Sequence, residues 1–131
     1  MRSKRVLIAE DNRDGADSLG QLVESWGHQA EVVYDGQAAV MLAVTFRPDV
    51  AILDINMPVM SGYKAARLLR DAHDQVLLIA MTGAPLVETR AMACDAGFHH
   101  YFSKPVELED LRRLLDDDKL EHLAPGFRMR D

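Results

Sequence analysis

Each of four short apolar runs in this sequence ends in polar side chains that could take part in chemistry. In chain order these side chains are Glu10 and Asp11, Asp54, Thr82 and Lys104. The run before Asp54, Val50 to Leu53, is too short for a helix and suits a strand buried on both faces. Ligands bind at the carboxyl ends of strands in an open parallel sheet, so Asp54 is placed for chemistry. Taken alone, it could equally be a turn former or a helix cap.

The chemistry that these residue types favour is phosphoryl transfer. Three carboxylates at one sheet edge repel one another, and a bound cation would neutralise them. Oxygen ligands without histidine or cysteine favour a hard ion, Mg2+ in particular. A carboxylate such as Asp54 beside Mg2+ can attack phosphorus and form an aspartyl phosphate. Lys104 could offset phosphoryl charge, and the Thr82 hydroxyl could donate to a phosphoryl oxygen.

The elements that must position these residues alternate along the chain. The apolar runs and their periodicity predict strands over 5–9, 29–33, 50–53, 76–81 and 100–102, and helices over 13–26, 37–46, 63–72, 87–96 and 108–115. Short connections between them favour a parallel sheet with helices on both faces. We therefore predict an α/β fold with a doubly wound five-stranded parallel sheet in the order 2-1-3-4-5, of the flavodoxin-like (βα)5 type. This order brings the polar strand ends together at one edge.

Length and composition bound the organisation of the chain. The 131 residues suit one domain, which we expect over 1–117, followed by a C-terminal tail or helix extension over 118–131 in which Leu120 and Leu123 could continue the last helix. The net charge of -6 argues against nonspecific nucleic-acid binding, so we expect protein partners and no direct nucleic acid. The sequence contains no apolar run of membrane-spanning length and no signal-peptide core, so we expect a cytoplasmic protein without a membrane partner.

Four short motifs together resemble one known family. They are Glu10-Asp11, Asp54-x-x-Met57-Pro58-x-Met60-x-Gly62, Thr82-Gly83 and Lys104-Pro105. In this order and at these spacings, the chain resembles the receiver domain of two-component response regulators, a phosphoprotein module of signal transduction. The resemblance extends from about Lys4 to Asp116.

The resemblance implies roles around a metal ion. Asp54 would be the phosphoacceptor and would also bind Mg2+. Asp11 would be a direct Mg2+ ligand, and Glu10 would bind through water. The backbone carbonyl of Asn56 would complete the protein's share of the metal shell.

It also implies how the phosphoryl group is held and sensed. Thr82 and Lys104 would contact that group, and the Lys104-Pro105 bond would be cis. Tyr101, three residues before Lys104, matches the aromatic switch position. A tyrosine in a terminal strand can also be simple packing, and we keep that alternative open.

As a receiver, the chain would take its phosphoryl group from a histidine kinase or phosphotransfer protein in a phosphorelay. It would then switch a protein-binding face toward a downstream protein target. Such a domain catalyses only its own phosphorylation and dephosphorylation. The segment from Gly97 to Pro105 is similar to receivers of the hybrid histidine kinase type, so the chain could be a single-domain regulator or part of a larger protein.

Three other functions fit the sequence less well. Phosphatases of the haloacid dehalogenase type carry Asp-x-Asp, whereas this chain has Asn56 at the second position. A flavodoxin-like cofactor site would need a Gly/Ser/Thr-rich phosphate cradle, but the loop from Glu10 to Gly15 is acidic. A non-phosphorylated interaction module would be expected to lack the acceptor or a metal ligand, and all of these residues are present.

Overall fold

The computed structural model describes residues 3–73, 75–83, 87–117 and 128–130. The strands are β1 (Arg5–Ala9), β2 (Gln29–Val33), β3 (Val50–Asp54), β4 (Leu77–Thr82), β5 (His100–Ser103) and β6 (Arg128–Arg130). The helices are α1 (Arg13–Ser25), α2 (Gly36–Phe46), α3 (Gly62–Ala72), α4 (Val87–Ala96) and α5 (Leu108–Asp116). The predicted alternation of five strands and five helices is confirmed, and each predicted boundary agrees with the structure or differs from it by one residue.

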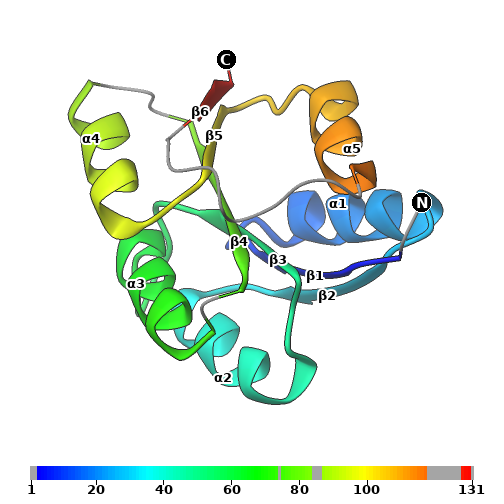
Figure 1. The fold of residues 1–131 in the computed structure, drawn as a ribbon, viewed down its shortest axis with the longest axis horizontal. Coiled ribbons are helices and arrows are strands. Elements are labelled where there is room, and N and C mark those ends of the chain that lie inside the picture. Colours follow the sequence, from blue (N-terminus) through cyan, green and yellow to red (C-terminus); the bar gives the residue numbers. More distant parts are fainter. Residues whose placement is uncertain (1–2, 74, 84–86, 118–127, 131) are drawn as a thin grey trace.

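All strand pairs of the sheet are parallel, and the strand order is β2-β1-β3-β4-β5-β6 (Figure 1). The predicted order 2-1-3-4-5 is therefore confirmed, and β6 adds a sixth strand beyond β5. This strand was not predicted, because Arg128–Arg130 offers no apolar run. The predicted continuation of α5 through Leu120 and Leu123 lies outside the described residues, and the division of the chain after residue 117 stays a prediction.

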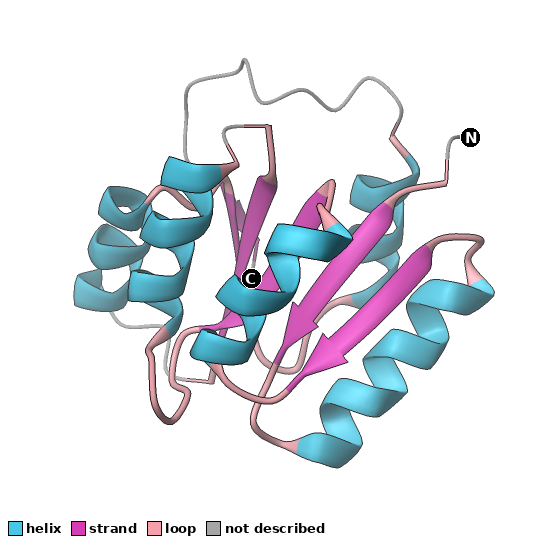
Figure 2. Cartoon of the chain, turned by 90° about the horizontal axis from the view of Figure 1, so that it is seen from below, coloured by secondary structure: helices cyan, strands magenta, loops and turns pink. Residues whose placement is uncertain are grey.

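Helices cover both faces of the sheet (Figures 1 and 2). On one face α2, α3 and α4 pack against alternate strand residues such as Leu53 and Leu78. On the other face α1 and α5 pack against the intervening residues, such as Ile52 and Ile79. The central strands β3 and β4 are buried along their whole length. This explains why both read as uninterrupted apolar runs.

Local signals set the ends of the helices. Asn12, Asp35 and Ser61 each accept a backbone N–H from the first turn of the helix that follows. Gly27 and Gly97 follow α1 and α4 with positive φ angles of 96° and 101°, a conformation that glycine adopts readily. The described residues contain no helix that is long and apolar enough to cross a membrane.

A buried polar contact fixes α5 on the same face as α1. The Lys4 backbone N–H donates to His28 Nδ1 over 3.0 Å, and His28 Nε2 lies 3.0 Å from Asp116 Oδ1. The Lys4 ammonium also donates to the Leu115 carbonyl. Since Nδ1 accepts a hydrogen bond, the neutral ring carries its proton on Nε2 and donates it to Asp116. The end of α5 is thereby tied to Lys4, the residue before β1, and to the segment after α1.

Candidate functional site

Three carboxylates meet at the carboxyl edge of the sheet. Glu10 and Asp11 directly follow β1, Asp54 ends β3, and these two strands are parallel neighbours. One oxygen from each residue lies within 4.8 Å of the others. Glu10 and Asp54 are buried and Asp11 is exposed. The strand order thus concentrates negative charge at one point.

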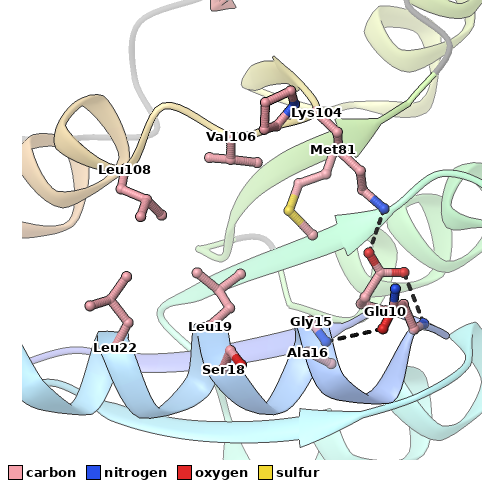
Figure 3. Close-up of a pocket in the computed structure, with 12 residues that line it drawn as sticks. Glu10, Gly15, Ala16, Ser18, Leu19, Leu22, Met81, Lys104, Val106 and Leu108 are labelled. Carbon is pink, nitrogen blue, oxygen red and sulfur yellow. Dashed lines mark hydrogen bonds and ion pairs between the residues drawn. The ribbon is translucent and has the colours of Figure 1, made fainter.

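Lys104 supplies the positive charge of the site. Its Nζ atom donates to Asp54 Oδ2 over 2.9 Å and also to Glu10 Oε1, the contact drawn in Figure 3. Burial alone would lower the pKa of Lys104, but the hydrogen bonds and negative charges of Glu10 and Asp54 outweigh burial and raise the pKa. Lys104 is therefore a cation at neutral pH, held between two of the three carboxylates.

The backbone orients both buried carboxylates. The Asn56 N–H donates to Asp54 Oδ1 over 3.2 Å, and the Asn12 N–H donates to Glu10 Oε2 over 3.2 Å. Each carboxylate therefore accepts one bond from the loop that follows it and another from Lys104. Such charge-assisted bonds hold a side chain in one orientation.

The loop after β3 is packed directly against Asp54. The Gly62 N–H donates to the Ile55 carbonyl over 2.8 Å, which brings the start of α3 back to the strand end. A Cβ atom on Gly62 would lie 2.3 Å from the Asp54 carbonyl oxygen. Glycine is required here because of this close approach of two backbone segments.

Thr82 and Lys104 come from the two strands beyond Asp54. Thr82 ends β4 one residue after Met81, which pairs with Asp54, and it is fully buried. The Lys104 N–H donates to the Thr82 carbonyl over 2.7 Å, and the peptide bond from Lys104 to Pro105 is cis, as the resemblance implied. The threonine and the lysine are thus joined through the backbone beside the carboxylates.

Tyr101 lies in the core rather than at the surface. It pairs with Ala80 of β4 and is 0% exposed, within the cluster that packs under α2, α3 and α4. In this conformation the Tyr101 ring is already inside the protein, so it cannot turn inward from solvent. Any switch at Tyr101 must start from a buried side chain.

The donor set fits a hard divalent cation. All three side chains are carboxylates, and one of them is exposed, which leaves room for water ligands that Mg2+ retains. Position 56, where a dehalogenase-type phosphatase would carry its acid, is an exposed asparagine whose N–H is directed to Asp54. The Asn56 carbonyl as a metal ligand stays a prediction.

The structure contains a cavity beside these residues that the sequence did not reveal. This cavity has a volume of about 390 Å³ and lies between α1 and the segment from Lys104 to Leu108. Its apolar wall includes Leu19, Leu22 and Met81, and Figure 3 shows Glu10 and Lys104 at one end. No local pattern predicts it, because its walls come from segments far apart in the sequence.

Comparisons with known proteins agree with this geometry. The family model for the response regulator receiver domain matches residues 6–116. Response regulator MprA of Mycobacterium tuberculosis is 33% identical over 132 residues, an alignment that covers 98% of this chain and 57% of that protein. The chain thus spans a little over half the length of this curated relative.

Two solved receiver domains are similar in structure as well as in sequence. The receiver domain of sensor histidine kinase PA1611 of Pseudomonas aeruginosa is 32% identical with a TM-score of 0.77, over 87% of this chain and 95% of that one, and was solved with a magnesium ion in its active site cleft. The receiver domain of a DNA-binding response regulator of Colwellia psychrerythraea is 29% identical with a TM-score of 0.78, over 83% and 92% of the two chains. With the family model matching most of its length, the chain belongs to the response regulator receiver domain family of two-component signalling.

Proposed function

We propose that Asp54 is the phosphoacceptor of this receiver and that Mg2+ bound by Glu10, Asp11 and Asp54 is its cofactor. The observation that carries this proposal is the single ammonium group of Lys104 held between Glu10 and Asp54 at the sheet edge. A lysine in this place can move from a carboxylate to an incoming phosphoryl oxygen without a change of fold.

The reaction transfers a phosphoryl group from the donor to a carboxylate oxygen. A carboxylate oxygen of Asp54 attacks the phosphorus of the donor, the bond from phosphorus to the leaving group breaks, and the leaving group departs with the electron pair. When bound, Mg2+ would neutralise charge on the phosphoryl oxygens. Lys104 would bind one phosphoryl oxygen and the Thr82 hydroxyl would donate to another. The loop around Asn56 and Gly62 keeps the attacking carboxylate in place.

The donor and the output follow from family membership. Receiver domains take phosphoryl groups from histidine kinases or phosphotransfer proteins, and we propose such a donor and a downstream protein target for this chain. A relative among the solved structures belongs to a DNA-binding regulator, so the expectation of no direct nucleic-acid contact stays a prediction. A cytoplasmic location and the hybrid kinase type also stay predictions.

We further propose that Thr82 and Tyr101 couple the acceptor to the outer face made by α4, β5 and α5. Tyr101 pairs with Ala80, two residues before Thr82 on the same strand. A phosphoryl group on Asp54 would add charge and acceptor oxygens, and a move of the Thr82 hydroxyl toward it would change the space that the Tyr101 ring fills. Because Tyr101 is already buried, the change would be one of packing.

The test is to identify the labelled residue. The protein is incubated with acetyl phosphate and Mg2+, treated with borohydride, which reduces an acyl phosphate, and digested for mass spectrometry. We expect the reduced residue at position 54, and none when EDTA replaces Mg2+. Reduction at another carboxylate, or equal labelling in the presence of EDTA, would overturn the assignment.

A further inference from the structure

The sixth strand of the sheet gives the outer edge of β5 a partner. Residues Arg128–Arg130 form β6, which pairs in parallel with His100, Tyr101 and Phe102 (Figure 1). An unpaired strand edge presents a row of backbone donors and acceptors that readily accept another strand. The β5 edge is therefore a strand-accepting surface. It includes Tyr101, and its last paired residue, Phe102, lies two residues before Lys104.

The arrangement of β5, α5 and β6 has a different hand from that of the other strand–helix–strand units. From β3 to β4 and from β4 to β5 the chain moves in one direction across the sheet, with α3 and α4 on one face. From β5 to β6 it moves in the same direction, but α5 lies on the opposite face. From β1 to β2 the chain moves in the opposite direction and α1 lies on the opposite face. Because both features are reversed, this unit has the same hand as the units from β3 to β4 and from β4 to β5. The crossover through α5 is thus of the opposite hand.

This opposite hand disfavours a connection within one chain. Crossovers between parallel strands are right-handed in about 98% of cases, because a right-twisted strand followed by a right-handed helix packs back onto the sheet only in that way. Moving α5 to the other face would restore the usual hand. The contact of His28 with Asp116 holds α5 where it is.

A strand supplied by another molecule is free of this restriction, since no helix joins it to β5. We propose that the β5 edge is a docking site for a second copy of this chain, and that the segment Arg128–Arg130 of each copy adds to β5 of the other. Reciprocal exchange of one short element is a common route to a closed two-fold dimer. Main-chain hydrogen bonds would provide the affinity, as in other additions of a strand to a sheet edge. The proposal does not depend on phosphorylation of Asp54.

Two single-cysteine proteins test which molecule supplies the strand that pairs with β5. In a Cys94→Ser background, one protein carries His100→Cys and the other Arg128→Cys, positions that are partners in the β5 and β6 register. The spacing of paired strands falls within the range that a disulfide needs. We expect a mixture of the two proteins, once oxidised, to yield a disulfide dimer with one chain of each kind. A third protein with both cysteines is the reference for docking within one chain.

The contradicting results are equally definite. If the double-cysteine protein forms an intrachain disulfide and the mixture forms no mixed dimer, the strand docks within its own chain. If neither forms a disulfide, the β5 edge does not accept this strand at all. Circular dichroism checks that each protein is folded.

Sedimentation of the full chain gives an independent measurement without substitutions in β5. The variant Met129→Pro/Arg130→Pro removes two consecutive N–H donors, one of which must face β5 because successive N–H groups of a strand point to opposite sides. We expect the wild type to dimerise with increasing concentration and this variant to remain a monomer. The matched control Met129→Val/Arg130→Thr keeps both donors and should still dimerise. A monomeric wild type, or a proline variant that dimerises equally, would overturn the proposal.

Discussion

Lys104 Nζ lies 2.9 Å from Asp54 Oδ2 and donates at the same time to Glu10, so one ammonium group serves two of the three clustered carboxylates. This contact joins the last strand of the predicted sheet to its first and third strands. It also means that Lys104 and a bound cation would compete for the same oxygens.

The competition predicts the behaviour of Lys104→Met. Without the ammonium group, two buried carboxylates lose a charge-assisted bond, and we expect the free energy of unfolding in metal-free buffer to fall by about 1–3 kcal/mol. Stabilisation by added Mg2+ should increase, because its competitor is gone. Thermal melts with and without Mg2+ measure both effects. Lys64→Met, an exposed lysine of α3, is the control, and similar melts for the two variants would contradict the prediction.

Asp11→Asn should have the reverse effect. Among the described residues, Asp11 is the acid of the cluster that forms no ion pair, so its removal relieves repulsion without breaking a bond. We expect stability in metal-free buffer to rise by about 1 kcal/mol, the repulsion of two unit charges about 4–5 Å apart at the dielectric constant of water, because Asp11 is exposed to solvent. Stabilisation by Mg2+ should fall. Asp71→Asn, an exposed acid on α3, serves as the control. A lower metal-free melting temperature for Asp11→Asn would refute the repulsion argument.

Two glycines beside the site should respond differently to alanine. A Cβ on Gly62 would approach backbone atoms of Asp54 and Ile55 within 2.3 and 2.8 Å, whereas a Cβ on Gly83 would meet nothing within 4 Å. We expect Gly62→Ala to destabilise the protein by about 1–3 kcal/mol and to slow labelling by acetyl phosphate, because Asp54 must shift. Gly83→Ala should retain both stability and labelling. Urea denaturation and labelling rates measure the two effects. Equal effects of alanine at positions 62 and 83 would contradict the prediction and show that the loop at Gly62 can relax.

The sequence predicted that the charged residues of the site lie close together, because each one ends an apolar run. Once Glu10, Asp54 and Thr82 are assigned to strand ends, the order of a doubly wound sheet brings them together. That Lys104 bonds to Glu10 rather than Asp11 could not be predicted, because it depends on side-chain geometry between distant strands. The burial of Tyr101 also depends on packing across the sheet. His100 of the same strand is buried as well.

Strand β6 escaped prediction for a different reason. A three-residue strand with two arginines has neither an apolar run nor a recognisable alternation. Its pairing depends on an open edge at β5, which is a property of the folded sheet. Local pattern reasoning cannot find such an element.

The proposed coupling of Thr82 to Tyr101 predicts a spectroscopic change far from the acceptor. Beryllofluoride with Mg2+ mimics a phosphoryl group on aspartate, and we expect it to shift amide resonances across Arg90 to Leu115 as well as around Asp54. Because Tyr101 is fully buried, its solvent exposure should not decrease further. Thr82→Ala should bind the mimic but leave the distant resonances unshifted. Shifts confined to the loops around Glu10, Asp11 and Asp54 in the wild type would contradict the coupling.

The identity of the acceptor is tested most directly by the intact mass of the protein after incubation with acetyl phosphate and Mg2+. The carboxylate of Asp54 is the nucleophile in our account, and the amide of Asp54→Asn is far less reactive toward phosphorus. We predict one added phosphoryl group on the wild type and on the control Asp71→Asn, and none on Asp54→Asn. Equal labelling of Asp54→Asn and the wild type would contradict the account.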